Sequence, residues 1–238
     1  FILPAHIYAK FIPIFAVAFY RHRMYINNDF SRLEINLNGC LENYRYFRSR
    51  LEADTKLLVL VKANAYGHGA VEFASLMEDA GADYLAVAYP VEGVELRQAG
   101  VRLPMMVLTA GTDSFDEIID NGLEPGIPNI YSLKVLCEVL DRRGVTDFPV
   151  HIKLDTGMHR LGFMTSEIPE LIAFLKDCHN VRVKSIYSHL AASDDPSCDE
   201  FTVSQAEMFK VNADVISEAI GYKPLYHLLN SAGIERFP

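Results

Sequence analysis

The sequence predicts an α/β protein built as a (β/α)8 barrel of the TIM type. From Met24 onward, short apolar segments rich in β-branched residues alternate with segments that have the apolar spacing of a helix. Continuously apolar strands separated by helices are typical of a parallel sheet covered by helices. An open doubly wound sheet would carry a glycine-rich phosphate loop after an early strand, and neither GxGxxG nor a P-loop motif occurs. The barrel is therefore favoured.

Seven strands are expected, one fewer than a complete barrel needs. They lie at 57–61, 84–88, 105–109, 123–127, 150–154, 183–188 and 225–229. Helices are expected at 70–80, 91–99, 114–121, 130–141, 167–177 and 202–220. Glycines at 81, 100, 122 and 144 follow four of the helical segments, as a left-handed C-cap favours. We therefore expect a barrel that stops before its last strand, and the alternating segment 33–37 is free to pair outside it.

Composition favours small-molecule chemistry. The 238 residues carry a formal net charge of −9 without a basic stripe, which argues against nucleic acid as a partner. Four cysteines show no CxxC or metal-ligand spacing and are expected to be free thiols in a reducing cytoplasm. The apolar start is interrupted by prolines and charge, so it is a poor membrane span and a poor signal peptide. We interpret 1–30 as an extension or linker and 31–238 as the barrel domain.

Polar side chains gather just after four predicted strands, where the catalytic groups of a barrel lie. They are Lys62, Asn64, Tyr66 and His68 after the first strand, Lys153, Asp155, His159 and Arg160 after the fifth, Ser188, His189 and Asp194 after the sixth, and Asn230 and Ser231 after the seventh. This set suits an anionic ligand, and it contains no cluster of carboxylates that would hold a metal.

Lys62 stands at the end of the buried-looking run LLVLV. Desolvation lowers the pKa of a lysine, and a neutral amine attacks carbonyl carbons. Such a lysine suits a Schiff base with pyridoxal phosphate, the cofactor that carries an aldehyde. The alternative is a lysine that extends to solvent at the rim of the barrel or pairs with a neighbouring carboxylate. Lys62 alone does not favour a Schiff base, and only the other polar motifs at the strand ends support that interpretation.

Four segments in order resemble motifs of the alanine racemase family, and the resemblance covers about 31–238. They are VKANAYGHG at 61–69, KLDTGMHRLGF at 153–163, SHLAASDD at 188–195 and NSAG at 230–233. The resemblance implies a (β/α)8 barrel followed by a mostly β domain, working as a cytoplasmic homodimer without membrane or nucleic-acid partners. It also implies pyridoxal phosphate as cofactor and the interconversion of L- and D-alanine, which supplies D-alanine for peptidoglycan and the cell wall.

The resemblance assigns a role to each matching residue. Lys62 would bind the cofactor covalently and act as the base at the α-carbon of alanine. Tyr66 and Ser231 would bind the cofactor phosphate, with Asn230 beside them as a further cofactor contact. Racemisation needs a proton donor on each face of the α-carbon, and the family's second donor is a tyrosine from the C-terminal domain of the partner subunit.

Three further residues complete the expected site. Arg160 would lie by the phenolic oxygen of the cofactor and help to hold the substrate carboxylate. Lys153 matches a position that is carbamylated in many family members, where the carbamate orients the arginine. His189 would lie beside the cofactor ring, bonded to an arginine at the ring nitrogen. Lys62, Arg160 and His189 form the expected catalytic set.

The chain departs from the family pattern in two respects. It ends at Pro238, before the ring-nitrogen arginine, the last strand and the β domain, and His159 stands where many members have glycine. Two alternatives therefore stay open: a racemase of serine or of a broader amino-acid range, and a cofactor-binding fragment without turnover of its own.

The remaining polar residues are expected to be structural. Asp155 is interpreted as a brace of the loop near Arg160, and His68 as a residue that fixes the loop after Lys62. His151 and His227 lie within predicted strands and are expected to be satisfied core or interface histidines.

Overall fold

We describe the fold from a computed structural model, which defines residues 33–237. The interpretation of 1–30 as an extension lies outside these described residues. A seven-stranded, all-parallel sheet runs in sequence order from β1 to β7. The strands are β1 Leu58–Leu60, β2 Tyr84–Val87, β3 Met105–Val107, β4 Glu124–Ile127, β5 Phe148–Lys153, β6 Val181–Tyr187 and β7 Leu225–His227. The predicted parallel barrel architecture is confirmed, and each strand lies where the sequence indicates it.

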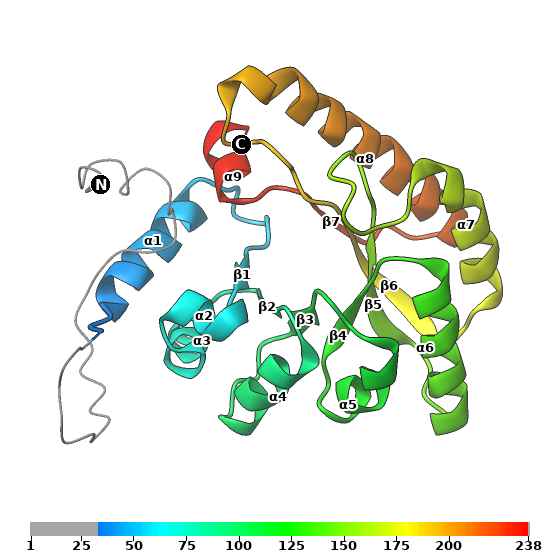
Figure 1. Cartoon of the computed structure of the whole chain (residues 1–238), viewed down its shortest axis with the longest axis horizontal. Helices are drawn as coiled ribbons and strands as arrows, with labels where there is room; N and C mark the ends of the chain where they lie inside the picture. Colours follow the sequence, from blue (N-terminus) through cyan, green and yellow to red (C-terminus); the bar gives the residue numbers. More distant parts are fainter. Residues whose placement is uncertain (1–32, 238) are drawn as a thin grey trace, which may run out of the picture.

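The helices cover the outside of this curved sheet (Figure 1). They are α1 Leu37–Ser49, α2 Lys62–Gly67, α3 Ala70–Asp79, α4 Pro90–Gln98, α5 Phe115–Asp120, α6 Ile130–Arg143, α7 Ile168–Asp177, α8 Asp199–Ile220 and α9 Ser231–Arg236, with 3-10 turns η2 Thr112–Ser114, η3 Thr165–Glu167 and η4 Pro196–Cys198. The four glycines expected to end helical segments all have positive φ. The six predicted helices are confirmed, whereas α1, α2 and α9 were not predicted.

In the segment 33–37, which we expected to be free to pair outside the barrel, Ile35 forms an isolated β-bridge, but no strand begins there. Helix α1 begins at its last residue, Leu37, and Asn36 is the N-cap, whose Oδ1 accepts a hydrogen bond from Gly39 N at 3.0 Å. An asparagine in this position satisfies one of the free amides of the first helical turn. The local cap therefore prevails over the alternating pattern that suggested a strand.

The core lies between the sheet and its helices. Leu85, Val107, Ile152 and Ile186 are fully buried there, together with apolar residues from the covering helices. A second, smaller apolar cluster consists of Ala86, Met106 and Tyr187, with partly buried Leu58, Leu60 and Leu108 packed against it. Polar side chains of the same sheet are buried as well, among them His151, Lys153 and Ser185.

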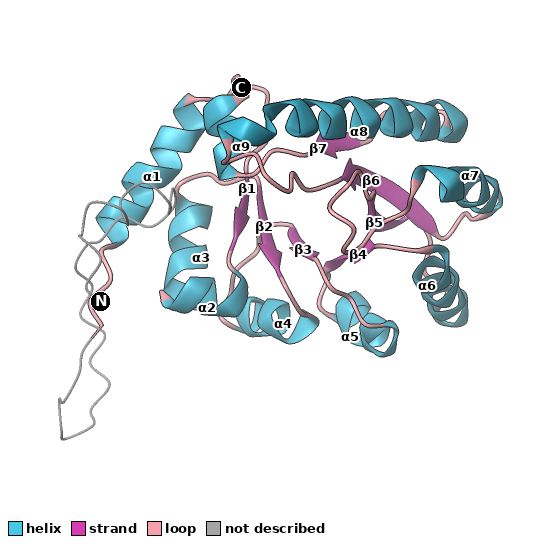
Figure 2. Ribbon diagram, turned by 45° about the horizontal axis from the view of Figure 1, so that its top comes forward, coloured by secondary structure: helices cyan, strands magenta, loops and turns pink. Residues whose placement is uncertain are grey.

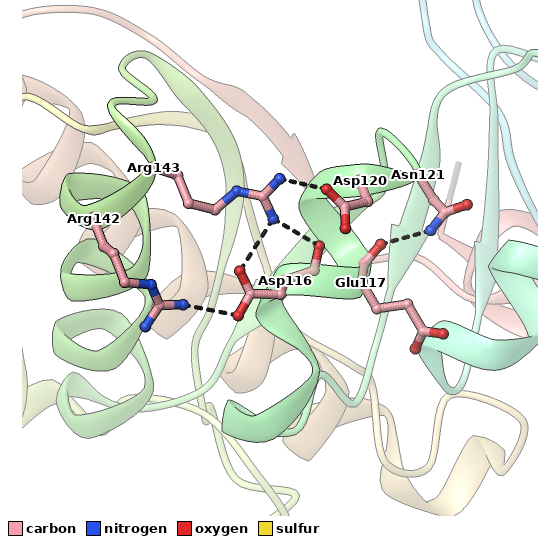
Figure 3. A network of polar contacts seen from close by, with 6 residues as sticks. All are labelled: Asp116, Glu117, Asp120, Asn121, Arg142 and Arg143. Atoms are coloured by element: carbon pink, nitrogen blue, oxygen red, sulfur yellow. Dashed lines mark hydrogen bonds and ion pairs between the residues drawn. The ribbon is translucent and has the colours of Figure 1, made fainter.

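Charged residues join α5 to α6 on the surface (Figure 3). Arg143 bonds both Asp116 and Asp120, and Arg142 lies 2.8 Å from Asp116 Oδ2. These side chains are largely exposed, so each pair contributes little to stability. The network links two neighbouring helices on the outer surface.

Helix α9 lies against α1, so the last and first described parts of the barrel meet (Figure 2). Tyr46 donates its hydroxyl proton to the Glu235 carboxylate, with O···O distances of 2.7 and 2.8 Å. Strands β1 and β7 are not paired with each other within residues 33–237, so helices bridge this side. None of the helices in that range is long and apolar enough to cross a lipid bilayer.

Candidate functional site

Lys62 follows β1 at the carboxyl edge of the sheet. The preceding Val61 is buried, and its amide donates to Ala86 O of β2 at 2.8 Å. Lys62 is half-buried, and its Nζ lies 5.9 Å from the centroid of the Tyr66 ring. Burial raises the pKa of Tyr66, which keeps that phenol protonated at neutral pH. The amine and the phenol therefore share one side of the strand edge.

The backbone after Lys62 forms a left-handed turn. The four consecutive residues 63–66 have φ values of 52, 54, 49 and 56°. A left-handed turn of L-residues costs about 1–2 kcal/mol per residue, and alanine has no side-chain group to offset it. Contacts with the rest of the fold must therefore hold this conformation.

Several hydrogen bonds hold the turn from its far end. Asn64 Oδ1 accepts from Ala70 N at 2.7 Å, and so satisfies the first turn of α3. His68 Nδ1 donates to Ala65 O at 2.8 Å, because a carbonyl can only accept. Ala65 itself is buried with 1% exposure. The contact supports the interpretation of His68 as a residue that fixes this loop.

Glu92 holds the end of the turn that lies next to Lys62. The sequence analysis did not identify this residue. Its Oε1 accepts from Ala63 N at 2.6 Å, next to Lys62. Its Oε2 accepts from Ala88 N at 2.7 Å and from Tyr89 N at 3.1 Å, at the start of α4. A glutamate three residues after a helix N-cap is a recognisable capping signal. Its reach to Ala63 could be found only in the folded structure.

Lys153 ends β5 and points into the barrel. Its exposure is 7%, and its Nζ lies 5.4 Å from the centroid of the Tyr187 ring. Burial, with added repulsion from Arg160 and Lys62, lowers the pKa of Lys153, although Asp155 opposes the shift. Lys62 and Arg160 are thus both close enough to Lys153 to act on it electrostatically.

The loop that carries Arg160 is built around Asp155. Asp155 Oδ1 accepts from the amides of Gly157 and His159 at 3.0 Å each, and Oδ2 lies 3.3 Å from His159 Nδ1. Burial opposes ionisation, but these donors together hold the pKa of Asp155 below its usual value. The interpretation of Asp155 as a brace is therefore supported. Arg160 itself is exposed at the rim.

Gly162 lets this loop return to the strand. Its φ is 128°, and a Cβ there would lie 2.5 Å from both Asp155 N and the carbonyl carbon of Leu154. Phe163 N then donates to Lys153 O at 2.8 Å, while Asp155 N donates to Phe163 O at 2.9 Å. Only glycine allows so close an approach of two backbone segments.

His189 follows β6 and is half-buried. Burial, followed by the charges of Arg160, Lys153 and Lys62, lowers its pKa, so the imidazole is neutral at pH 7. Four of the predicted site residues, from the ends of β1, β5 and β6, are therefore brought together. Three of these four residues are lysine or arginine, and such a concentration of basic side chains suits a phosphorylated ligand.

Asn230 and Ser231 begin α9. Asn230 Oδ1 accepts from Gly233 N at 2.9 Å and from Ser193 Oγ at 2.7 Å, and its Nδ2 donates to Leu190 O at 3.3 Å. Its side chain is thus used to tie α9 to the loop after β6. Ser231 is the first residue of the helix and is half-buried. The structure places both beside the His189 loop.

A buried polar network crosses the interior of the barrel below this edge. His151 Nδ1 and Ser185 Oγ are 2.6 Å apart, and His151 Nε2 lies 2.9 Å from Glu124 Oε2. Tyr84 donates to the same carboxylate oxygen at 3.1 Å. Both ring nitrogens of His151 therefore have partners, in agreement with the expectation of a satisfied core histidine.

His227 does not meet the same expectation. Its ring stacks on Tyr187 with centroids 4.9 Å apart, but within residues 33–237 neither His227 Nε2 nor Tyr187 Oη has a hydrogen-bond partner. Burial, with smaller contributions from His151 and Lys153, lowers the pKa of His227 to about 3. Within the described residues His227 is therefore not a satisfied core histidine, whereas its interpretation as an interface histidine stays a prediction.

Comparison with known proteins shows the family of this chain. Residues 35–238 match the family model described as alanine racemase, N-terminal domain. The chain belongs to the alanine racemase N-terminal domain family. It is 36% identical over 203 residues to an alanine racemase of Synechocystis, covering 84% of this chain and 54% of that protein. The chain thus spans about half the length of the curated relatives it matches.

Solved structures of alanine racemases share the fold. The alanine racemase of Clostridium difficile 630 has a TM-score of 0.77 and 35% identity, over 83% of this chain and 55% of its own. That of the D-cycloserine producing Streptomyces lavendulae has a TM-score of 0.79 and 28% identity, over 85% and 53% respectively. These likenesses confirm the recognition made from four motifs in the sequence.

The donor set at the strand edge fits the cofactor that the family implies. A phosphorylated aldehyde needs an amine to condense with and cations or hydroxyls to neutralise its phosphate and phenolate. Lys62 would supply the amine, Arg160 and Lys153 would supply positive charge, and Tyr66 and Ser231 would supply hydroxyls at the same edge. His189 adds a neutral ring nitrogen.

Proposed function

We propose that this chain is the pyridoxal phosphate-binding part of an amino-acid racemase that interconverts L- and D-alanine. The observation that carries the proposal is the convergence of Lys62, Lys153, Arg160 and His189 at one barrel edge. Besides burial, Arg160 and Lys62 lower the pKa of Lys153, and Arg160, Lys153 and Lys62 lower that of His189. The names of the relatives support alanine as substrate. The product would serve peptidoglycan synthesis in the cytoplasm.

When bound, pyridoxal phosphate withdraws electrons from the α-carbon of an amino acid and so makes its α-proton acidic. Lys62 Nζ would hold the cofactor and take or return that proton on one face. Tyr66 and Ser231 would donate hydroxyl protons to the phosphate, with Asn230 holding the start of α9 in place. The family resemblance assigns the other face to a tyrosine of a partner subunit, so turnover is expected from the full-length homodimer.

Arg160 and Lys153 would act on the substrate side. The Arg160 guanidinium would hold the substrate carboxylate, since its planar donors match a carboxylate in a bidentate way. Burial, followed by repulsion from the neighbouring Arg160, lowers the pKa of Lys153. A carbamate on Lys153 would replace that repulsion by attraction and would orient Arg160. His189, kept neutral, would pack at the cofactor ring without adding a proton.

The first test is chemical trapping. Treatment of the protein with pyridoxal phosphate, borohydride reduction and peptide mapping should place a pyridoxyl label on Lys62. Lys62→Ala should abolish both the label and the visible absorbance of the bound cofactor, whereas the exposed Lys176→Ala should change neither. A label on another lysine, or none, would overturn the proposal. Coupled detection of D-alanine with the full-length protein then decides whether the bound state turns over.

A further inference from the structure

The Glu92 carboxylate connects the start of its own helix, α4, to the left-handed turn that follows Lys62. One oxygen, Oε2, accepts from Ala88 N and Tyr89 N at 2.7 and 3.1 Å and so satisfies the start of α4. The other, Oε1, accepts from Ala63 N at 2.6 Å. The second contact is not needed for a helix cap, because a capping glutamate bonds only the backbone just before its own helix.

Glu92 contacts Ala63 at the start of the left-handed turn, a backbone conformation that is unfavourable for L-residues. Ala63 is the first of the four left-handed residues, with φ 52° and ψ 50°, and it directly follows Lys62. Such residues persist only where surrounding structure fixes them, and they concentrate at functional sites. A charged acceptor forms a stronger hydrogen bond to an amide than a neutral one does. Glu92 is thus suited to hold the first peptide of the turn.

Glu167 provides an internal comparison. It also stands three residues after an N-cap and is half-buried, and its Oε2 accepts from Met164 N at 2.8 Å at the start of η3. Among the described residues Glu167 shows only this local bond, whereas Glu92 reaches a second segment 29 residues away in the chain. The two glutamates therefore share a capping role and differ in the contact beside Lys62.

We propose that Glu92 is a positioning residue: by bonding Ala63 N it holds the left-handed turn that directs Lys62 toward the cofactor. The role of Lys62 rests on the proposed function, whereas the proposal that Glu92 stabilises the left-handed turn does not depend on it. Without the carboxylate, the turn would relax toward right-handed or extended backbone, and the Lys62 amine would leave the position where it meets the aldehyde. Glu92 touches neither cofactor nor substrate in this assignment.

The test compares Glu92→Gln with Glu167→Gln in the same chain. Glutamine keeps the size of the side chain but offers one acceptor oxygen, so it cannot serve both Ala63 and the start of α4. Hydrogen–deuterium exchange of the 61–67 backbone without cofactor measures the turn. Titration with pyridoxal phosphate, with borohydride mapping of the Lys62 label, measures the positioning. Circular dichroism verifies that each variant folds. If Glu92→Gln does not fold, Glu92→Asp takes its place, because the shorter side chain is expected to keep only the bonds to the start of α4.

We expect faster exchange over 61–67 in Glu92→Gln and an increase of about tenfold or more in the dissociation constant of pyridoxal phosphate, the effect of losing one charge-assisted hydrogen bond. Glu167→Gln should leave exchange over 61–67 unchanged and the constant within about twofold. Unchanged exchange, or an unchanged constant in Glu92→Gln, would overturn the inference. Absence of a Lys62 label in the wild-type chain would instead refute the proposed function, and exchange alone would then decide whether Glu92 holds the turn.

Discussion

Ionisable side chains buried inside the barrel couple its stability to pH. Lys153 and His227 both have lowered pKa values, because burial disfavours their charged forms and neighbouring cations add to that effect. For a base with a lowered pKa, the folded state binds fewer protons than the unfolded one between the two pKa values. Stability therefore rises with pH across that interval and is lost as pH falls through it.

Lys153→Met should stabilise the chain at pH 7. It replaces a buried ammonium by an apolar group of similar shape, which removes the burial penalty and the repulsion from Arg160 and Lys62. We expect the melting temperature to rise by about 2 °C or more at pH 7. The gain should shrink as pH approaches the ordinary lysine pKa of 10.5. Calorimetry across pH measures it, with exposed Lys176→Met as the control. A lower melting temperature at pH 7 would contradict a buried ammonium and indicate a modified side chain.

His227→Phe should make the chain less sensitive to acid. The folded-state pKa of about 3 lies below the ordinary 6.5, so acid favours the unfolded chain over that interval. Wild type should lose about 2 kcal/mol more than His227→Phe between pH 7 and pH 5. Phenylalanine keeps an aromatic ring on Tyr187, which preserves the stack. Urea unfolding at both pH values measures the difference, and exposed His179→Gln should behave as wild type. Equal acid sensitivity of His227→Phe and wild type would refute the assignment.

At the scale of elements, the site depends on short connections after the strands. The turn after β1 adopts a left-handed backbone, and the loop after β5 folds back on its own strand through Gly162. Both connections present a charged side chain, Lys62 in one and Arg160 in the other. Their geometry is set by backbone contacts as much as by the side chains that carry the chemistry.

Gly162→Ala tests the loop after β5. The added Cβ would collide with backbone at 2.5 Å, and backbone cannot move aside as a flexible side chain can. We expect a loss of about 3 kcal/mol in urea unfolding and weaker cofactor binding through displacement of Arg160. Gly100→Ala is the matched control, since its φ of 99° is also positive but its Cβ would meet open space. It should cost about 1–2 kcal/mol and leave cofactor binding unchanged. Equal effects of the two substitutions would contradict the close approach.

At the scale of the whole molecule, we expect bound cofactor to raise the stability of the folded chain. A ligand that binds only the folded state stabilises it by about 2.7 kcal/mol at 100 times its dissociation constant. Pyridoxal phosphate at that concentration should raise the melting temperature by about 5–10 °C. Lys62→Ala should abolish the covalent part of this rise. Thermal scans with and without cofactor measure it, and an unchanged wild-type melting temperature would show that residues 33–237 do not form the site.

Much of this molecule could be predicted without coordinates. The alternation of apolar runs and helical segments places all seven strands. The polar residues at the strand ends predict a candidate site of Lys62, Lys153, Arg160 and His189, and the structure brings these four together. These signals are local, since each depends on residue type at a fixed spacing. The segment 33–37 shows the limit of such reasoning, because its alternation suggested a strand whereas Asn36 starts a helix.

The sequence by itself determined the order of the elements, the family and the edge of the sheet at which the candidate site residues lie. Tertiary structure decided the left-handed turn over 63–66, the reach of Glu92 to Ala63 and the unpartnered Nε2 of His227 within residues 33–237. The physical reason is that alanine prefers a right-handed backbone, so no local signal indicates the turn. Only contacts between residues far apart in the chain can stabilise it, and those contacts exist only once the barrel has formed.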